Sequence, residues 1–293
     1  MPTPRQQLKA LVEARRGVPV PGAFNALSAK LIADLGFQAI YVTGAGVTNM
    51  WFGMPDQGFM GLAEIADHTA RIRDAVELPL IVDADTGFGN ALNVHHTVRT
   101  LERAGADCIQ LEDQVSPKRC GHFDGKDVIA LDEAVDKIKA AVDARRDPDL
   151  MILARTDAAA TQGTQAAIDR ACAFAEAGAD ILFVEALTHE DEVRGLPARL
   201  PRPALMNLVI GGRTPIVPAA ELGALGYGIV LYANAALQGA VAGMQQVLGA
   251  LRQHGEVHEG SGLVTSFAER QRLVGKPQWD ALEARYAGRD PAG

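Results

Sequence analysis

The sequence has 293 residues, of which 48% are hydrophobic and 5% aromatic, and its formal net charge is −8 at pH 7. This balance argues against a nucleic-acid-binding protein, which needs a basic face, and no basic run suits a membrane surface. Residues 1–17 lack the apolar segment of a secretory signal, no stretch is long enough to cross a bilayer, and the three cysteines give no disulfide pattern. We therefore expect a cytoplasmic protein.

Eight apolar runs of strand length are spaced along the chain. In four of them a glycine typical of a helix end comes just before the apolar segment, as in "LGFQAIYVTG" (35–44) and "AGADCIQLED" (104–113). Helix-like stretches lie between the runs, for example at 93–104, 131–146 and 166–177. The predicted strands lie within 17–24, 35–44, 78–85, 104–113, 149–156, 177–186, 203–209 and 225–234.

Alternating strands and helices predict a parallel sheet of the α/β class. Eight such units in about 250 residues fit a closed (β/α)₈ TIM barrel. The alternative is an open Rossmann-type sheet, but neither "TGAGVTNM" nor "TGFGN" completes G-x-G-x-x-G. No linker rich in proline and glycine divides the chain, so residues 1–293 are expected to form one barrel domain. Residues 263–287 are expected to add C-terminal helices whose apolar side chains could pack on another subunit.

Catalytic groups of a parallel barrel gather where the strands end, and here these positions are rich in carboxylates. Asp83 and Asp85 share one side of their strand at a spacing of roughly 7 Å, so they repel unless a cation lies nearby. We predict Mg²⁺, with Mn²⁺ as the alternative, held by Asp83, Asp85 and Glu112, because hard cations prefer oxygen ligands. Zinc is disfavoured, since no cluster of histidine and cysteine has ligand spacing. The other strand ends carry Tyr41, Thr43, Gly44, Ala45, Asp113, Arg155, Asp157, Glu185 and Asn207.

The segment "EDQVSPKRCGHFDGK" (112–126) directly follows the fourth predicted strand. Lys118, Arg119 and His122 flank Cys120, and such positive neighbours lower a thiol pKa and raise its reactivity. Gly121 and the glycine at 125 would let the loop close over a site and reopen. The other interpretation is a basic surface loop with an incidental cysteine.

The segments "VDADTGFG", "EDQ…KRCGH" and "ARTDA" together resemble the isocitrate lyase/phosphoenolpyruvate mutase superfamily, and the likeness covers nearly the whole chain. The "KRCGH" loop resembles the methylisocitrate lyase/dimethylmalate lyase-like branches. The resemblance implies a Mg²⁺-dependent barrel, usually a homotetramer with C-terminal helices swapped between subunits. It also implies cleavage of a 2-hydroxy di- or tricarboxylate, of the methylisocitrate or alkylmalate type, to a 2-oxo acid such as pyruvate and a carboxylic acid.

The same resemblance implies a role for each matching residue. Asp85 would bind the metal directly, while Asp83 and Glu112 would act largely through water. Cys120 would be the catalytic acid and Tyr41 a base whose pKa the cation depresses. The remaining residues would bind the substrate or support the chemistry: Thr43, Gly44 and Ala45 as a carboxylate cradle, Asp56 near the metal, Arg155, Glu185 and Asn207 around the oxo-acid half, and Lys118, Gly121 and His122 in the loop of Cys120.

The segment "LVIGGRTP" after Asn207 departs from the related lyases, because Ile210 stands where one branch has glutamate. If Ile210 faces the pocket, it suits an acid less polar than a tricarboxylate. Three other functions remain open from the residues. They are oxaloacetate decarboxylation or hydrolysis at the same enolate-stabilising site, phosphonate rearrangement, which Cys120 disfavours, and binding of oxo acids by a non-catalytic sensor.

Overall fold

The computed structural model describes residues 1–119, 125 and 127–287. Eight parallel strands close into a barrel in chain order, and β1 pairs with β8 to complete the ring. Each predicted strand run contains one strand of this ring, so the expected TIM barrel is confirmed. The strands are β1 (Val18–Ala23), β2 (Ile40–Val42), β3 (Leu80–Asp83), β4 (Cys108–Glu112), β5 (Met151–Thr156), β6 (Ile181–Val184), β7 (Ala204–Asn207) and β8 (Tyr227–Tyr232).

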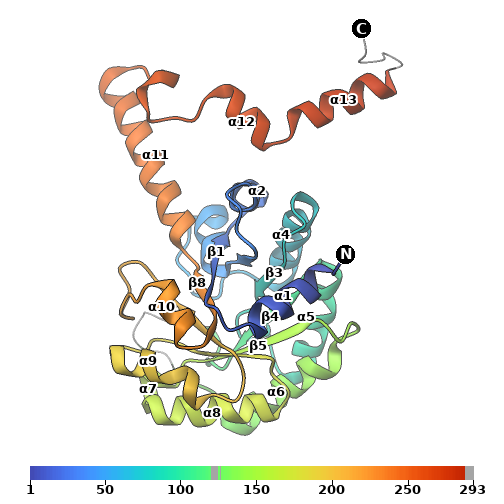
Figure 1. Ribbon diagram of the computed structural model, residues 1–293, viewed down its shortest axis with the longest axis vertical. Helices are drawn as coiled ribbons and strands as arrows, with labels where there is room; N and C mark the ends of the chain where they lie inside the picture. The colour runs from blue at the N-terminus through green and yellow to red at the C-terminus, as the bar shows by residue number, and fades with distance from the viewer. Residues whose placement is uncertain (120–124, 126, 288–293) are drawn as a thin grey trace. The chain divides into compact units, whose positions relative to one another are not determined.

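Helices connect the strands around the outside of the barrel (Figure 1). The three helical stretches singled out in the sequence are α5, α6 and α8, and their ends differ from the prediction by at most two residues. The helices are α1 (Pro4–Glu13), α2 (Ala26–Asp34), α3 (Gly44–Val47), the π-helix η1 (Thr48–Phe52), α4 (Leu62–Ala75), α5 (Ala91–Arg103), α6 (Leu131–Ala144), α7 (Ala159–Gln162), α8 (Thr164–Glu176), α9 (Glu190–Arg199), α10 (Ala219–Ala224), α11 (Ala235–His254), the 3₁₀-helix η2 (Glu259–Ser261), α12 (Phe267–Leu273) and α13 (Lys276–Tyr286).

The repeated glycines end helices as the sequence predicts. Gly36, Gly105, Gly178 and Gly226 have φ angles of 82°, 99°, 103° and 99°, and each comes directly after the last residues of a helix. Glycine adopts this left-handed conformation without the steric cost that a Cβ atom adds. The chain therefore leaves each of these helices sharply and enters the next strand within a few residues.

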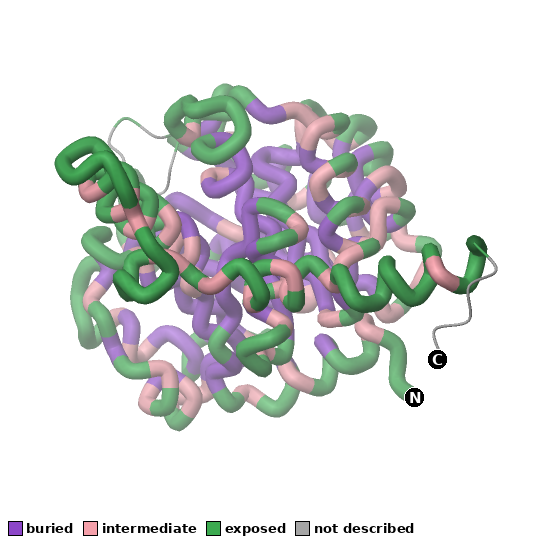
Figure 2. The backbone as a smooth tube through the Cα atoms, turned by 90° about the horizontal axis from the view of Figure 1, so that it is seen from above, coloured by how far each residue is buried: buried purple, intermediate pink, exposed green. Residues whose placement is uncertain are grey.

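Most strand residues are buried, and Figure 2 shows the buried parts of the chain gathered in the middle of the barrel. Apolar side chains from the strands form the core cluster of the interior. Val20, Ile81 and Leu153 belong to one continuous cluster with Leu8 and Val12 of α1. Burying one such side chain contributes roughly 1.5–3 kcal/mol to folding. A core of this kind holds the strand ends in fixed positions, which is what the site at the carboxyl end requires.

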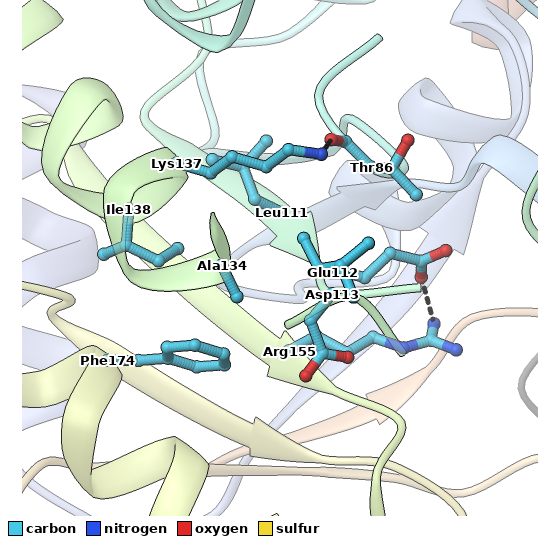
Figure 3. Close-up of a pocket in the computed structure, with 10 residues that line it drawn as sticks. Thr86, Leu111, Glu112, Asp113, Ala134, Lys137, Ile138, Arg155 and Phe174 are labelled. Atoms are coloured by element: carbon cyan, nitrogen blue, oxygen red, sulfur yellow. Dashed lines mark hydrogen bonds and ion pairs between the residues drawn. The ribbon is translucent and has the colours of Figure 1, made fainter. Parts of the chain in front are cut away.

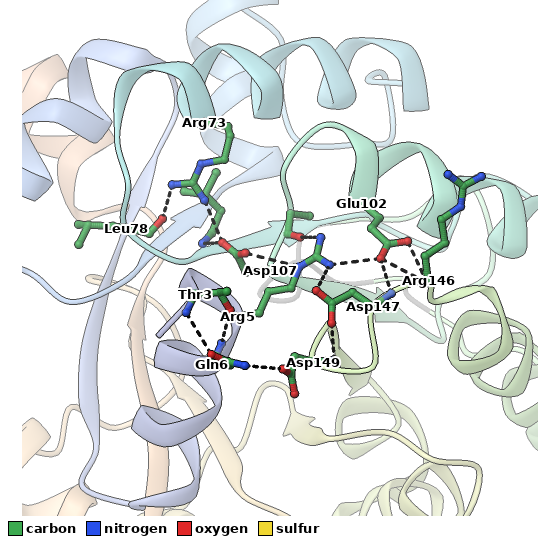
Figure 4. A network of polar contacts seen from close by, with 12 residues as sticks. Thr3, Arg5, Gln6, Arg73, Leu78, Glu102, Asp107, Arg146, Asp147 and Asp149 are labelled. Carbon is green, nitrogen blue, oxygen red and sulfur yellow. Dashed lines mark hydrogen bonds and ion pairs between the residues drawn. The ribbon is translucent and has the colours of Figure 1, made fainter. Parts of the chain in front are cut away.

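A polar network ties α1 to the amino end of the barrel (Figure 4). Arg5 forms ion pairs with Asp147 at 2.7 Å, with Glu102 at 3.3 Å and with Asp107 at 3.7 Å. Arg73 also pairs with Asp107, at 3.0 Å. In TIM barrels the residues at the amino end usually stabilise the fold, whereas the catalytic residues lie at the carboxyl end.

By contacts the chain divides into two compact units, Met1–Leu237 and Gln238–Gly293. The first holds the barrel. The second holds most of α11 together with α12 and α13, so the predicted segment 263–287 is largely helical. Its apolar side chains include the exposed Phe267 and Trp279. Within the described residues, no helix is long and apolar enough to span a membrane.

Candidate active site

Buried acids collect at the carboxyl end of the barrel. Asp83 is the last residue of β3, Glu112 is the last residue of β4, and Asp85 lies two residues beyond β3 with a positive φ of 47°. All three are more than nine-tenths buried. A Cβ atom at Gly44 would lie 3.0 Å from Asp83 Oδ2 and 3.4 Å from Asp85 Oδ1. The absence of a side chain at Gly44 thus makes room for two carboxylates side by side.

Lys118 places a positive charge among these acids. Its Nζ atom lies 2.5 Å from Oδ1 of Asp56 and 2.9 Å from Oδ1 of Asp85, and its side chain is only 5% exposed. Burial alone would lower the pKa of Lys118, but the charges of the surrounding carboxylates, led by Asp85 and Asp56, hold it well above its ordinary value. In this structure the counter-ion that the aspartate pair requires is the Lys118 ammonium group.

One lysine does not balance the whole cluster. Burial raises the pKa of Asp85 to about 7, although Lys118 acts in the opposite direction. Burial also raises the pKa of Glu112 well above its usual range, despite Arg155 and Lys118 nearby. Burial therefore keeps these carboxyl groups from ionising as readily as they do in water, and further positive charge would stabilise their ionised forms.

The donor set fits a hard divalent cation. Oε1 of Glu112 is a buried oxygen that accepts no hydrogen bond from the described residues, whereas Oδ1 of Asp85 is buried against the Nζ of Lys118. Such oxygens are the ligands that Mg²⁺ and Mn²⁺ prefer. Among residues 1–119, 125 and 127–287, no three histidine, cysteine, aspartate or glutamate side chains are already arranged as metal ligands. A cation would have to draw the acids together around itself.

Arg155 reaches Glu112 across two neighbouring strands (Figure 3). Its Nη1 lies 3.3 Å from Oε2 of Glu112. Its Nε and Nη2 donate to the two carboxylate oxygens of Asp157, at 2.9 Å and 3.1 Å, and the guanidinium group lies over the ring of Phe183. These paired hydrogen bonds to Asp157 fix the plane of the guanidinium group, which therefore has a defined orientation in the site.

Tyr41 of β2 is buried beside the acids, and its pKa is raised well above the ordinary value by burial and by the charge of Asp83. Its surroundings here thus favour the protonated phenol. A cation at the acids would oppose the effect of Asp83, so a basic Tyr41 depends on bound metal, as the sequence interpretation assumed.

The predicted carboxylate cradle at residues 43–45 is partly used within the protein. Oγ1 of Thr43 accepts a hydrogen bond from the N–H of Gly46 and caps the short helix α3. The N–H of Gly44 points toward Oδ2 of Asp83 at 3.4 Å. Thr43 and Ala45 still line the cavity of the site.

Two further predicted residues lie on the next strands around the ring. Glu185 directly follows β6, Asn207 ends β7, and the Asn207 amide donates to Oε2 of Glu185 at 3.4 Å. Both residues line the same cavity as Tyr41 and Arg155. The barrel thus brings the predicted residues Tyr41, Arg155, Glu185 and Asn207, which lie on or just after four different strands, around one cavity.

Cys120, Gly121 and His122 lie outside the described residues. The part of their loop that precedes them is held at its base, because the side chain of Gln114 forms hydrogen bonds with both the N–H and the carbonyl oxygen of Arg119. Lys118 and Arg119 both line the cavity. The described part of the loop therefore brings Lys118 and Arg119 to the site.

The cavity has a volume of about 40 Å³, and several of its lining residues were not predicted. The condition stated for Ile210 is not met, because this residue is 53% exposed and Val209 lines the cavity instead. Asn234, two residues beyond β8, was missed although the eighth apolar run ends at this residue. The rule that catalytic groups of a parallel barrel lie where its strands end (the strand-end rule) would have found Asn234 if it had been applied to that last strand. The other unpredicted lining residues are Phe183, Leu231 and Ala233, and Arg119 was named only as a neighbour of Cys120.

A closed parallel barrel with buried acids, a lysine and an arginine converging on a cavity at its carboxyl end has the arrangement of a TIM-barrel enzyme. The family model of phosphoenolpyruvate phosphomutase matches residues 8–252. The chain is 43% identical to 2,3-dimethylmalate lyase of Eubacterium barkeri, over 96% of this chain and 97% of the relative. It is 41% identical to 2-methylisocitrate lyase of Aeropyrum pernix, over 96% and 90%. The chain therefore belongs to the isocitrate lyase/phosphoenolpyruvate mutase superfamily, within which it is a carbon–carbon lyase.

Solved structures agree with this assignment. Oxaloacetate acetylhydrolase in complex with the inhibitor 3,3-difluorooxalacetate has a TM-score of 0.91 and 32% identity, covering 99% of this chain and 98% of that one. A 2,3-dimethylmalate lyase has a TM-score of 0.90 and 33% identity, covering 98% and 96%. A phosphonopyruvate hydrolase in complex with oxalate and Mg²⁺ has a TM-score of 0.88 and 33% identity, covering 98% and 100%. Small carboxylic acids are thus ligands of several structures with this fold.

Proposed function

We propose that this chain is a Mg²⁺-dependent lyase that cleaves the C2–C3 bond of a 2-hydroxy di- or tricarboxylate. The products would be a 2-oxo acid such as pyruvate and a saturated carboxylic acid. The observation that supports this most directly is the buried acid cluster of Asp83, Asp85 and Glu112, in which Oε1 of Glu112 accepts no hydrogen bond from a described residue and Oε2 pairs with Arg155. The named activities of the two relatives are both consistent with it.

Asp85 would hold the cation directly, with Asp83 and Glu112 acting largely through water. When bound, the cation supplies Lewis-acid stabilisation to the oxygens of the 2-oxo acid as it forms. Arg155 adds a fixed positive charge on the same side, because Asp157 holds its guanidinium group in place. Thr43 and Ala45 would contact the carboxylate of that half of the substrate.

Two protons move in the proposed reaction. Tyr41, as its phenolate, takes the proton of the C2 hydroxyl group, and the C2–C3 bond breaks to leave an enediolate on the departing acid. The thiol of Cys120 then donates its proton to C3 of that acid, while Lys118 and His122 of the same loop help to set the state of the thiol. Exchange with solvent returns Tyr41 and Cys120 to their starting forms, so no net proton is lost.

A product assay tests this function. The protein is incubated with Mg²⁺ and, separately, with 2,3-dimethylmalate, 2-methylisocitrate and oxaloacetate, and 2-oxo acids and carboxylic acids are identified by chromatography. We expect cleavage of a hydroxy acid, and we expect the C120S variant to lose turnover by orders of magnitude while it still binds Mg²⁺ in calorimetry. Cleavage of oxaloacetate alone, or near-normal turnover in C120S, would contradict the proposal.

We also propose a cytoplasmic homotetramer whose C-terminal helices are exchanged between subunits. The support is the apolar surface of the second unit, where Met244, Leu248, Phe267, Trp279 and Tyr286 are all at least 45% exposed. Exposed apolar surface of this extent usually marks an interface. Sedimentation of the full chain and of a chain shortened before residue 263 would test the assembly, since the shortened chain should give a smaller particle.

A further inference from the structure

Arg170 is a buried arginine of α8, one of the helices outside the barrel, and the proposed reaction does not use it. Its Nε donates to Oδ2 of Asp113 at 2.9 Å, and its Nη2 donates to the carbonyl oxygen of Ile129 at 2.7 Å. Arg170 and Asp113 are both more than nine-tenths buried. Because burying such a pair costs the hydration of both charges, it contributes little to stability unless further hydrogen bonds satisfy the carboxylate.

The carboxylate of Asp113 has two further donors, and both lie at the end of β5. Its Oδ2 accepts a hydrogen bond from the hydroxyl group of Thr156 at 2.7 Å, and its Oδ1 accepts one from the N–H of Asp157 at 3.0 Å. Thr156 is the last residue of β5, and Asp113 directly follows β4. The pair of Asp113 and Arg170 therefore joins α8 to the ends of two neighbouring strands.

Glu112 and Asp113 serve opposite sides of one strand end. Glu112 lies in register with Arg155 of β5, and consecutive side chains of a strand point to opposite faces. Figure 3 shows the carboxylates of Glu112 and Asp113 pointing in different directions. Glu112 thus contacts Arg155 in the site, whereas Asp113 contacts Arg170 on the side of the helices.

Asp157 connects the two arginines. Its N–H donates to Asp113, while its carboxylate accepts the paired hydrogen bonds from Nε and Nη2 of Arg155, at 2.9 Å and 3.1 Å. A displacement of Asp113 would therefore move the backbone of Asp157 and the carboxylate that orients Arg155. Burial and, to a smaller extent, the charge of Asp157 raise the pKa of Asp113, whereas Arg170 favours its ionised form. Arg170 thus keeps Asp113 an acceptor for the end of β5.

A positive charge binds an anion best when its direction is fixed before the anion arrives, because less conformational freedom is then lost on binding. We propose that Arg170 is a positioning residue, which acts through Asp113 and Asp157 to hold the guanidinium group of Arg155 in its anion-binding orientation. This inference rests on the proposed function for the role of Arg155, but its test does not require turnover.

The test measures the binding of oxalate by calorimetry at saturating Mg²⁺ in a double-mutant cycle. We expect Arg170→Met to weaken oxalate binding about 10-fold, the loss expected when a hydrogen bond to a charged group is disturbed. A lysine at position 155 cannot form the paired hydrogen bonds to Asp157. In the Arg155→Lys background, Arg170→Met should therefore change oxalate affinity by less than about twofold. Arg170→Lys keeps the charge and should recover part of the lost affinity.

Arg145→Met is the matched control. Nη1 of Arg145 also donates to one carboxylate and one carbonyl group, at 2.9 Å to Oδ2 of Asp180 and at 3.0 Å to the oxygen of Leu150. These two partners precede β6 and β5, at the amino end of the barrel. Both Arg145→Met and Arg170→Met should lower the melting temperature, but only Arg170→Met should weaken oxalate binding. A purely structural role of Arg170 would not produce this difference.

Four results would overturn the inference. They are unchanged oxalate affinity in Arg170→Met, the same loss in the Arg155→Lys background, the same loss in Arg145→Met, and a wild-type protein that does not bind oxalate. If Arg170→Met does not fold, Arg170→Lys takes its place in the cycle and should show a smaller loss that again disappears in the Arg155→Lys background. If the binding pattern is as expected but no hydroxy acid is cleaved, the lyase proposal fails while the role of Arg170 stands.

Discussion

Lys118 and Asp85 form an ion pair inside the carboxyl end of the barrel, with 2.9 Å between Nζ and Oδ1. The pair joins the loop after β4 to the loop after β3, and both side chains are nearly inaccessible to solvent. The loop that carries the predicted catalytic thiol is therefore coupled electrostatically to the predicted metal ligand.

Replacing Lys118 by methionine should destabilise the metal-free protein. The change leaves buried carboxylates without their counter-ion, which typically costs about 3–5 kcal/mol. Urea unfolding should show this loss, and Mg²⁺ at a hundred times its Kd should return about 2.7 kcal/mol. Lys139→Met is the control, because its pair with Asp136 is exposed and should matter by less than about 0.5 kcal/mol. Equal stability of the K118M variant and the wild type without Mg²⁺ would contradict the role given to Lys118.

Replacing Asp85 by asparagine should abolish Mg²⁺ binding. The amide keeps the shape of the side chain but removes the charge that a hard cation requires. Calorimetry should detect no binding at concentrations that saturate the wild type, and turnover should fall by orders of magnitude. Asp67→Asn removes a carboxylate from an exposed pair with Arg71 and should leave both quantities unchanged. A D85N variant that binds Mg²⁺ normally would remove Asp85 from the ligand set.

Mg²⁺ affinity should fall as the pH drops below about 7. Burial raises the pKa of Asp85 to about 7, so at lower pH the cation must displace a proton from this group. The loss of Mg²⁺ affinity approaches about tenfold per pH unit when one proton is displaced.

The stability of the metal-free protein should also depend on pH. The same raised pKa of Asp85 means that the folded metal-free protein binds a proton more tightly than the unfolded chain. Its stability should therefore decrease as the pH rises from about 4 to 7, and the D85N variant should lack this contribution. Calorimetry and urea unfolding across this range measure the two effects.

Arg155→Lys should lower kcat/KM by roughly 100-fold. A lysine cannot reproduce the paired hydrogen bonds to Asp157 and at the same time reach Glu112, so its charge loses its fixed position. Steady-state kinetics with the substrate found in the product assay measure this change. Arg71→Lys on the exposed face of α4 serves as the matched control and should retain full activity. Activity of R155K close to the wild type would show that orientation of this charge is unimportant.

Arg5→Ala should separate stability from activity. The change removes the ion pairs to Glu102, Asp107 and Asp147 and should lower the free energy of unfolding by about 2–3 kcal/mol. Because this network lies at the amino end of the barrel, kcat and KM below the melting temperature should not change. A loss of kcat without a loss of stability would be inconsistent with a purely structural role.

The fold could be predicted because its signals are local. Each apolar run contained one strand, and Gly36, Gly105, Gly178 and Gly226 all took the conformation that their position before a strand suggested. The strand-end rule placed Asp83, Glu112 and Asn207 correctly, since it depends only on where a strand stops. Its one avoidable failure is Asn234, where the last strand was not followed to its end.

The contacts of the loops could not be predicted in the same way. Lys118 reaches Asp56 across 62 positions of sequence, and its approach to Asp85 depends on how two loops fold over the barrel. Ile210 and Val209 are neighbours in an irregular segment, where no periodicity indicates which side chain faces inward. The π-helix η1 has no local sequence signal of this kind either.

The two ends of the barrel treat their acids differently. At the amino end Arg5 and Arg73 form ion pairs with Asp107. Around the cavity at the carboxyl end, the described acids Asp56, Asp83, Asp85, Glu112 and Glu185 outnumber the described basic residues Lys118, Arg119 and Arg155, and Oε1 of Glu112 accepts no hydrogen bond from a described residue. The mouth therefore presents a negative electrostatic potential that attracts divalent cations and repels free dicarboxylates. Binding would therefore be ordered, with the metal ion entering the site before the organic anion. At low metal concentration the organic anion would bind only weakly to the metal-free protein.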